Sequence, residues 1–331
     1  MLIKLLLNYV NRLNLIDIPN HRSIHKVNTP RGGGIAFGFS FFISTLIFDF
    51  YFFINFYYIY LAIFLVFFIG IIDDYKNVSP KWKFIFIIMA TLILYLNDIY
   101  ISSLNIYLSY ELSLGYFGLF FTIFALVGFT NALNLIDGID GLASFISIII
   151  LSCFLYIGYI NDDIFIIGFC TILLACISSF LFFNYPKATI FMGDSGSLFL
   201  GFCIGFIGIL SLKYIHSISI FYICALPLID TLVVMFRRVL NKRSPFIADK
   251  KHIHHILLNY FDNSVKKTLF VLVFIQFIFS IIGLVIQYYS SFIINYNISF
   301  YLFILFIIIL ALFYYFLRYI DNKNSSIKSN L

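Results

Sequence analysis

Long apolar stretches alternate with short polar segments along almost the whole chain. Each is close to the ~20 residues that an α-helix needs to cross a bilayer, and none shows the alternation of a membrane β-barrel. The stretch 1–16 is also apolar, but Asn8, Asn11 and Arg12 interrupt it, so it is either a truncated first helix or follows a misplaced start codon. The ten clear spans are predicted at 33–50, 54–72, 84–100, 114–135, 141–160, 164–183, 198–215, 218–236, 268–288 and 298–320.

Composition points to the same class. Of the 331 residues, 62% are hydrophobic and 11% are charged, whereas a soluble domain has roughly 25% charged residues. A soluble fold is therefore excluded, and the many aromatic residues exclude a disordered chain. We predict an all-α, polytopic integral membrane protein with about 10–11 transmembrane helices. Residues 1–331 are expected to form one membrane-embedded domain, with a basic, histidine-containing loop at 237–267.

The basic residues indicate an orientation in the membrane. If segment 17–32 faces the cytoplasm and the spans alternate, every Lys and Arg except Lys4 and Lys213 falls on that side. Lys and Arg are enriched in cytoplasmic loops, and the same segments hold nearly all of the unusual polar residues. A pump or channel places ionisable residues within its spans, but these spans are almost uncharged. Chemistry is therefore expected at the cytoplasmic face.

Two adjacent carboxylates, Asp73 and Asp74, end the second clear span. The negative end of the helix dipole disfavours carboxylates at this position. A divalent cation or a nearby Lys is therefore expected to offset their charge. A solvated helix end before a turn at Pro80 is the alternative interpretation.

Amides and carboxylates recur three residues apart at Asn131, Asn134 and Asp137, and Asp140 follows. A helix places residues three apart on neighbouring positions of its surface. Unpaired polar groups at the end of a membrane helix are costly. The pattern therefore favours a site for Mg²⁺ and a polar ligand over a purely structural network.

The segment 184–197 ends in Gly-Asp-Ser-Gly-Ser and is expected to form a flexible acidic turn before a helix that starts at Leu198. Backbone amides at a helix N-terminus suit phosphate, and the carboxylate of Asp194 suits a hard cation. A serine-protease nucleophile is rejected, because this string lies at the edge of a bilayer rather than in a β-barrel loop.

Three histidines, His252, His254 and His255, follow two lysines in the basic loop. A zinc site is one interpretation, but no Cys lies nearby and the lysine pair would repel a cation. Contacts to a diphosphate or a sugar fit these residues better. Asp230, which lies within the eighth predicted span, is interpreted as a buried structural partner.

Together and in this order, these motifs resemble those of the polyprenyl-phosphate N-acetylhexosamine-1-phosphate transferases, also called glycosyltransferase family 4. The resemblance extends from Asp17 to His255 and depends on the Asp73–Asp74 pair and on segments 131–143, 193–201 and 252–255. Segment 17–34 and the His-x-His-His pattern are closest to the O-antigen branch of undecaprenyl-phosphate N-acetylglucosaminyl-1-phosphate transferases. The short first span departs from the family pattern.

The resemblance implies a multi-pass enzyme of the bacterial inner membrane with its active site on the cytoplasmic face. A UDP-N-acetylamino sugar would give its sugar-1-phosphate to undecaprenyl phosphate, with release of UMP, as the initiating step of O-antigen or cell-envelope polysaccharide synthesis. Mg²⁺ is the implied cofactor and Mn²⁺ the alternative. No nucleic-acid partner is implied. A homodimer, the identity of the sugar, and the choice between single displacement and an aspartyl-phosphate intermediate stay open.

The resemblance also implies residue roles. Asp194 and Asn134 would be the metal ligands, and Asp73 and Asp74 would position or deprotonate the lipid phosphate. The implied catalytic residues are Asp73, Asp74, Asp137, Asp140, His252, His254 and His255; the implied substrate-binding residues are Asn131, Asn184, Phe191, Lys76 and Arg31.

Two alternative interpretations come from other functional classes. A transporter or flippase for a lipid-linked sugar predicts polar residues within the spans and on both faces, whereas here they gather at one face. A non-catalytic homologue would not need the complete acidic set that the chain retains.

Overall fold

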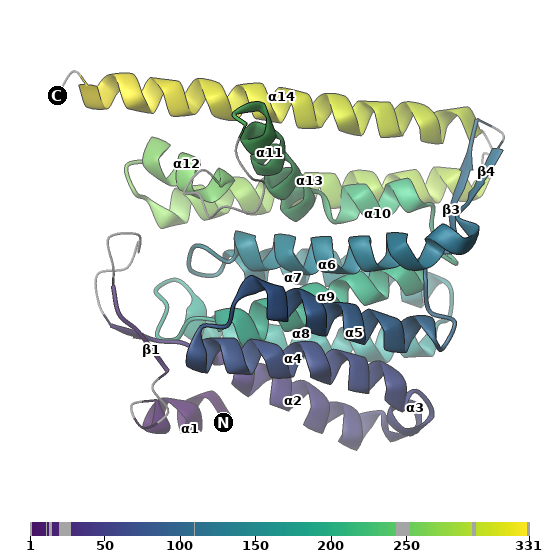
Figure 1. Cartoon of the computed structure of the whole chain (residues 1–331), viewed down its shortest axis with the longest axis horizontal. Coiled ribbons are helices and arrows are strands. Elements are labelled where there is room, and N and C mark those ends of the chain that lie inside the picture. The colour runs from purple at the N-terminus through teal and green to yellow at the C-terminus, as the bar shows by residue number, and fades with distance from the viewer. Residues whose placement is uncertain are drawn as a thin grey trace. The chain divides into compact units, whose positions relative to one another are not determined.

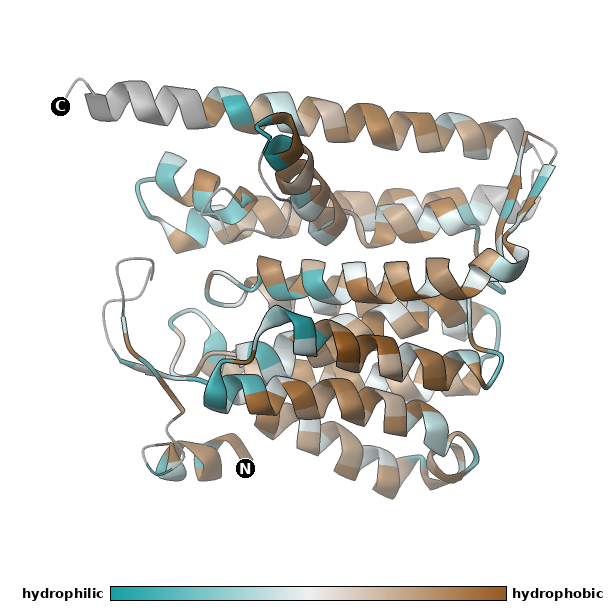
Figure 2. Ribbon diagram, viewed as in Figure 1, coloured by the Kyte–Doolittle hydropathy of each residue, from teal (hydrophilic) through white to brown (hydrophobic). Residues whose placement is uncertain are grey.

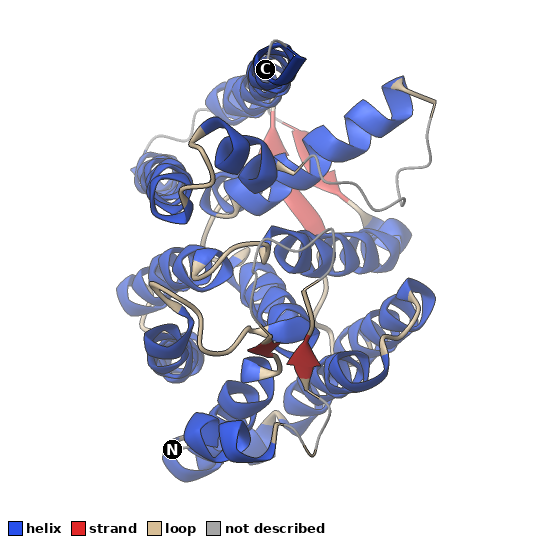
Figure 3. Ribbon diagram, turned by 90° about the vertical axis from the view of Figure 1, so that its left-hand side faces the viewer, coloured by secondary structure: helices blue, strands red, loops and turns tan. Residues whose placement is uncertain are grey.

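Helices occupy all ten of the predicted spans (Figure 1). The computed structural model describes residues 2–10, 12, 15–19, 28–108, 110–242, 252–292 and 296–329, without the side chains of 289–292, 296–297 and 321–329. The chain divides into two compact units, which are described separately: unit 1 comprises Met1–Ser102 and Leu114–Tyr214, and unit 2 comprises Ser103–Ser113 and Ile215–Leu331. Figure 3 shows that helices dominate the structure, which confirms the all-α prediction.

Unit 1 contains nine α-helices, one 3₁₀ turn and one short strand pair among its described residues. These are α1 (Leu2–Tyr9), β1 (Ile16–Asp17), β2 (Thr29–Pro30), α2 (Gly33–Phe48), α3 (Phe50–Asn55), α4 (Tyr57–Lys76), α5 (Pro80–Tyr95), η1 (Gly115–Phe117), α6 (Gly118–Ile136), α7 (Leu142–Ile160), α8 (Ile164–Asn184) and α9 (Gly193–Ser211).

Unit 2 contains a hairpin and five helices among its described residues. These are β3 (Ser103–Tyr107), β4 (Tyr110–Ser113), α10 (Ser217–Ile223), α11 (Ala225–Leu240), α12 (Ile253–Tyr260), α13 (Val265–Phe292) and α14 (Tyr296–Ser329). The antiparallel hairpin lies in a segment for which the sequence predicted only an outward loop.

Seven helices in the described part of the chain are long and apolar enough to cross a membrane, and the count is eight if α10 and α11 together form one span. Helices α2 and α5 have 16 residues each, or about 24 Å of length against a hydrocarbon core of about 30 Å. Apolar residues dominate the helices in Figure 2, as expected for a polytopic membrane protein.

Helix α9 forms the core of unit 1. It packs against α2, α4, α6 and α7, and 78% of an 18-residue apolar stretch of this helix is buried. Glycines allow the closest approaches: a Cβ atom on Gly70 of α4 would lie 2.6 Å from the Cα atom of Ser195, and one on Gly34 of α2 would collide with the backbone of Gly196. The first turn of α9 is therefore held in direct contact with two neighbouring helices.

One predicted helix start is wrong, and one predicted span is bent. The segment 193–197 is not a turn before a helix that starts at Leu198, because it already forms the first turn of α9. The predicted span 218–236 is not one straight helix, because α10 and α11 meet at an angle of 85° near Cys224. In both places side chains from distant parts of the chain satisfy the backbone groups, as described below.

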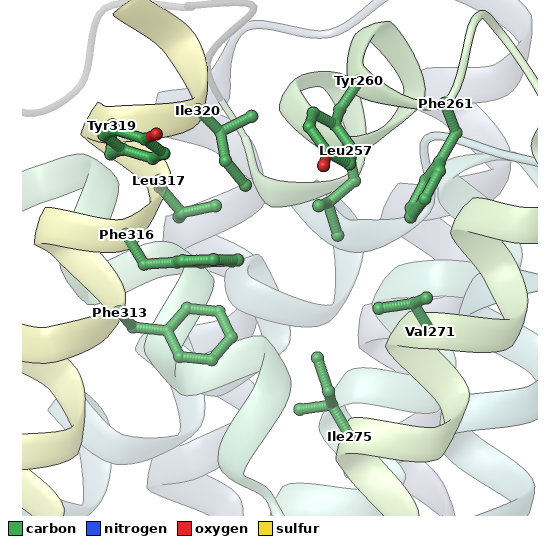
Figure 4. A pocket seen from close by; sticks show the side chains of 10 residues that line it. All are labelled: Leu257, Tyr260, Phe261, Val271, Ile275, Phe313, Phe316, Leu317, Tyr319 and Ile320. Carbon is green, nitrogen blue, oxygen red and sulfur yellow. The ribbon is translucent and has the colours of Figure 1, made fainter. Parts of the chain in front are cut away.

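An apolar cavity of about 220 Å³ lies within unit 2 between α12, α13 and α14 (Figure 4). Its lining includes Leu257, Val271 and Phe316 and contains no carboxylate, amide or imidazole group. The cavity therefore lacks the groups that the sequence predicts for a phosphate or metal site.

Candidate active site

The carboxylate of Asp74 connects the end of α4 to the beginning of α9. Its Oδ1 accepts a hydrogen bond from the backbone N–H of Asp194 at 2.8 Å, and its Oδ2 accepts one from Ser195 at 3.1 Å. The first N–H groups of a helix have no partner within the helix, and a carboxylate there also interacts favourably with the helix dipole. Asp74 therefore explains why α9 begins at Gly193 rather than at Leu198.

Gly193 makes this approach possible. Its φ of +75° lies in the left-handed region, and a Cβ atom at this position would be 2.6 Å from the carboxylate oxygens of Asp74. Glycine avoids both the backbone strain and the collision.

Lys83, in the first turn of α5, lies between Asp73 and Asp194. Its Nζ is 2.8 Å from Oδ2 of Asp73 and also pairs with Oδ2 of Asp194. Oδ1 of Asp73 accepts the backbone N–H of Val78 at 2.6 Å, which fixes the connection between α4 and α5. Figure 2 shows hydrophilic residues at this connection. The sequence predicted that a divalent cation or a nearby lysine offsets the charge of the two adjacent carboxylates. The structure shows the lysine, Lys83, beside Asp73.

The charge of Lys83 is maintained by its partners. Burial lowers the pKa of the ammonium group, but the charges and hydrogen bonds of Asp194 and Asp73 outweigh this and raise the pKa above its ordinary value. Lys83 is therefore charged and forms the centre of an acidic cluster.

Helix α6 brings two amides to the same region. Asn134 donates through Nδ2 to Oγ of Ser197 on α9 at 2.8 Å, and Ser197 donates to the carbonyl of Gly193 at 3.1 Å. Asn131 lies three residues earlier on α6. The predicted helical spacing of the two asparagines is confirmed, because both lie in the last turns of α6.

Asp137 follows the end of α6 and is half-buried. Burial, together with the charges of Asp194, Asp74 and Asp140, raises the pKa of its carboxyl group to about 7. Asp137 therefore lies within electrostatic range of the other three aspartates, and the described residues of this region carry more acidic than basic groups.

Two loops beside this cluster hold each other through side chains. Asp140 accepts the backbone N–H of Ala188 at 3.0 Å. Asn184, which is buried, accepts the N–H of Gly141 at 2.8 Å and donates to the carbonyl of Ile190 at 3.0 Å. Both side chains thus fix the shape of the loops that follow α6 and α8.

The segment before α2 joins the same end of unit 1. The backbone of Phe191 accepts a hydrogen bond from Gly33 at 2.9 Å and donates one to Pro30 at 2.8 Å. Arg31 donates to Oδ1 of Asn77 at 3.4 Å, close to the end of α4. Lys76 is exposed, with its ammonium over the ring of Tyr75, so the structure does not bring it into the acidic cluster.

The oxygen atoms of this cluster suit Mg²⁺ if substrate phosphates complete the coordination of the ion. Asp194, Asp73 and Asn134 provide the hard oxygen atoms that this ion prefers. Within the described residues, no three His, Cys, Asp or Glu side chains converge closely enough to hold a metal by themselves. Mg²⁺ is commonly bound through one or two carboxylates together with substrate phosphates. The donors therefore fit an ion that arrives with a phosphorylated substrate.

The three histidines lie in unit 2, at the beginning of α12. The rings of His252 and His254 are nearly parallel at 11°, with centroids 5.9 Å apart, and those of His254 and His255 are 4.3 Å apart. Burial and the neighbouring histidines lower the pKa of His254 to about 3. His254 is therefore neutral and offers hydrogen bonding rather than positive charge. Its Nδ1 has no hydrogen-bond partner among the described residues.

Sequence reasoning assigned no role to Lys83 and left Asp230 as a structural partner. Lys83 lies ten residues after Asp73, just past Pro80. The expectation that a nearby lysine offsets the two carboxylates could have identified it. Asp230 binds His252 in the structure. Its signal was that an acidic residue within an apolar span is costly and needs a partner.

The model of the family described as glycosyl transferase family 4 matches residues 56–212, which include Asp73, Asn134 and Asp194. A probable undecaprenyl-phosphate N-acetylglucosaminyl 1-phosphate transferase of Bacillus subtilis (strain 168) is 32% identical over 83% of this chain and 78% of its own length. The undecaprenyl-phosphate alpha-N-acetylglucosaminyl 1-phosphate transferases of Haemophilus influenzae and Escherichia coli (strain K12) are 35% and 30% identical; each alignment covers 75% of this chain, and 73% and 70% of the respective relative.

Proposed function

This chain belongs to glycosyltransferase family 4, the polyprenyl-phosphate N-acetylhexosamine-1-phosphate transferases, and we propose that it transfers an N-acetylamino-sugar-1-phosphate from a UDP-sugar to undecaprenyl phosphate. The observation that carries the proposal is the cluster of Asp73, Asp74, Asp194 and Lys83 at the ends of apolar helices. Such a cluster suits a reaction between two phosphorylated substrates, one of which stays in the membrane.

The reaction joins two anions, and this defines the task of the residues. An oxygen of the lipid phosphate attacks the phosphorus nearest the sugar, the bond from that phosphorus to the oxygen of the UMP phosphate breaks, and UMP leaves. The lipid phosphate is largely ionised near neutral pH, so the main need is alignment and neutralisation of charge. Lys83 supplies a fixed positive charge that faces two carboxylates.

Asp194 and Asn134 are proposed to hold Mg²⁺, which when bound would polarise the phosphoryl oxygens and offset their charge. Asp73 would position the lipid phosphate beside Lys83. Asp74 already uses both carboxylate oxygens on the backbone of α9, so its proposed role is to hold Asp194 in place. This gives the two adjacent aspartates different tasks.

The nucleotide is proposed to lie toward the loops after α6 and α8. Asp137 and Phe191 would contact the uridine end or its phosphates, while Asp140 and Asn184 would act by fixing these loops through the hydrogen bonds described above. Asn131, Arg31 and Lys76 are proposed as additional substrate contacts. The three histidines of unit 2 are assigned to the diphosphate and the sugar by the family resemblance.

We further propose that the donor is a UDP-N-acetylamino sugar, with N-acetylglucosamine as the first candidate because the relatives are named for it. The location proposed is the bacterial inner membrane, with the acidic cluster on the cytoplasmic face. The product would start an O-antigen or related cell-envelope polysaccharide.

The test is to incubate membranes that contain the protein with undecaprenyl phosphate, Mg²⁺ and a panel of UDP-sugars. Mass spectrometry of the lipid and chromatography of the nucleotide identify the bond that breaks. We expect a lipid with two phosphates, release of UMP, and reversal when excess UMP is added. Release of UDP with a lipid monophosphate would contradict the proposed mechanism, and unchanged nucleotide with every donor would favour a transporter or a non-catalytic homologue.

A further inference from the structure

Asp230 of α11 is a buried acid in unit 2, and it uses both carboxylate oxygens on the segment that begins α12. Its Oδ2 is 2.8 Å from Nδ1 of His252, and its Oδ1 accepts the backbone N–H of Ile253 at 2.8 Å. The side chains of Asp230 and His252 are only 1% and 6% exposed. Two hydrogen bonds therefore connect Asp230 to residues that are 22 and 23 positions away in the sequence.

The chemistry of this contact determines the state of the ring. A carboxylate only accepts hydrogen bonds, so Nδ1 of His252 must carry a proton. The other ring nitrogen, Nε2, is then left for a further contact, as an acceptor in the neutral ring or as a donor in the charged ring. Asp230 thus fixes both the orientation and the protonated nitrogen of the first histidine in the cluster.

The hydrogen bond also affects the neighbouring histidine. The ring of His254 is buried and lies nearly parallel to that of His252. Within the described part of the chain, its Nδ1 has no hydrogen-bond partner. A change in the orientation of His252 would therefore alter the surface that His254 packs against.

The position of Asp230 depends on the bend between α10 and α11. At this break Gln276 of α13 accepts the N–H of Leu226 at 3.0 Å and donates to the carbonyl of Ile223 at 2.6 Å. Its Nε2 also donates to Oγ of Ser280 at 2.8 Å. Backbone groups freed by a broken membrane helix must be satisfied within the protein. Leu226 lies one helical turn before Asp230, so Gln276 fixes the turn from which Asp230 projects.

We infer that Asp230 is a positioning residue that sets the orientation and tautomer of His252, and that Gln276 holds the helix bend that places Asp230. The inference rests on the proposed function in one respect, because His252 is assigned there to the diphosphate and the sugar. The side chain of Asp230 is 1% exposed and both of its oxygens are hydrogen-bonded within unit 2, so its effect on transfer is expected to pass through His252.

Asp230→Asn is the informative variant. The amide oxygen of asparagine still accepts the N–H of Ile253, which preserves the start of α12, but the amide nitrogen can only donate to Nδ1 of His252. The ring would then carry its proton on Nε2. A comparable aspartate-to-asparagine change that forces the wrong histidine tautomer is strongly damaging in the serine-protease triad. We expect kcat/KM to fall by about tenfold or more.

A double-mutant cycle with His252→Ala separates positioning from general structure. If Asp230 acts through His252, Asp230→Asn costs little more once His252 has been removed. Equal losses of kcat/KM in the two backgrounds would overturn the inference.

Nitrogen NMR of ¹⁵N-histidine-labelled protein gives a readout that needs no activity, with His252→Ala assigning the resonance. The Nδ1 and Nε2 shifts of His252 are expected to exchange character in Asp230→Asn, and unchanged shifts would also overturn the inference. Absence of transfer by the unmodified protein would instead contradict the proposed function and leave the NMR test decisive for Asp230.

Gln276→Met tests the second half of the inference. Methionine keeps the size of the side chain and removes both hydrogen bonds at the bend. Gln287→Met, at another buried glutamine of the same helix, is the matched control. We expect the His252 shifts to change in Gln276→Met and not in Gln287→Met. If the His252 shifts in both variants equal those of the unmodified protein, the bend does not position Asp230.

Discussion

Helix α9 has a Lys–Asp cluster near each end, and the two differ in how fully their charges are matched. At its beginning, Lys83 faces Asp73 and Asp194, with Asp74 and Asp137 nearby. After its end, Lys213 pairs with Asp163 at 2.8 Å. The two clusters are separated by the length of the helix, about 28 Å for 19 residues.

The cluster around Asp163 is fully satisfied. Its Oδ1 caps α8 by accepting the N–H of Ile166, and its Oδ2 accepts from Tyr214 and pairs with Lys213. Burial raises the pKa of this carboxyl group, but these hydrogen bonds and the lysine outweigh it and lower the pKa. The charged form of Asp163 therefore stabilises the fold.

Among the residues that the structure describes, the cluster around Asp194 has more acids than Lys83 alone can offset. A purely structural site would relax such repulsion, so the excess charge indicates a site that is completed by something positive. The comparison thus contrasts an ion pair that joins helices with one that the proposed function assigns to the reaction. Each prediction below pairs a change at one end of α9 with a matched change at the other.

Asp194→Asn and Asp163→Asn should show the largest contrast. The first removes the proposed anionic metal ligand without changing the size of the side chain, and transfer is expected to fall by more than about 100-fold. Loss of a residue that only hydrogen-bonds to a metal ligand typically costs about 10–100-fold. The second keeps the helix cap and should retain transfer while losing thermal stability. Transfer is measured from the mass of the lipid product at several Mg²⁺ concentrations, and stability from Tm in detergent. Near-normal turnover of Asp194→Asn at limiting Mg²⁺ would remove its proposed role.

Lys83→Met and Lys213→Met test the two cations in the same way. Loss of Lys83 leaves Asp73 and Asp194 facing each other without a counter-charge, and transfer should fall by about 10–100-fold. Lys213 is 53% exposed at its side chain, so its removal should cost less than about 1 kcal/mol of stability and leave transfer unchanged. Equal rates of transfer by the two variants would show that Lys83 has no role in the reaction.

The helix positions on which these variants depend were largely predictable. Apolar runs located a helix in each predicted span, and the spacing of Asn131 and Asn134 placed both on the last turns of α6, because these features are local. The start of α9 was missed because its capping carboxylate, Asp74, is 120 residues away. The bend between α10 and α11 was missed for a similar reason, since Gln276 lies 50 residues beyond Leu226. Long-range hydrogen bonds leave no local pattern in a sequence.

Labelling from outside the cell tests whether the two ends of α9 face opposite sides of the membrane. The five native cysteines are buried, so a cysteine introduced at an exposed loop position gives the signal. We expect a membrane-impermeant maleimide to label Asp162→Cys in intact cells and Lys187→Cys only in inverted vesicles. Strong labelling of both variants in intact cells would contradict a cytoplasmic location for the acidic cluster.

The smallest expected effect is a pH dependence of stability that has opposite signs at the two ends. Burial and neighbouring aspartates raise the pKa of Asp137 to about 7 in the folded protein. A carboxyl group with a raised folded pKa binds more protons when folded, so the protein should lose stability as pH rises from about 4 to 7. Asp163 has a lowered pKa, so its contribution is present above about pH 4 and is lost as pH falls through its folded pKa.

Thermal unfolding in detergent with EDTA, from pH 4 to 8, measures this difference against Asp137→Asn and Asp163→Asn. Asp137→Asn should match the unmodified protein at pH 4 and exceed its stability at pH 8 by up to about 1 kcal/mol, because a half-buried charge is partly screened. Asp163→Asn should be less stable than the unmodified protein throughout this range, because the contribution of Asp163 is lost only below about pH 4, as pH falls through its folded pKa. Added Mg²⁺ should reduce the advantage of Asp137→Asn, since a cation in the acidic cluster offsets the repulsion. If the stability of Asp137→Asn and that of the unmodified protein change in parallel from pH 4 to 8, the charge of Asp137 does not destabilise the acidic cluster. The proposed electrostatic difference between the two ends of α9 would then be wrong.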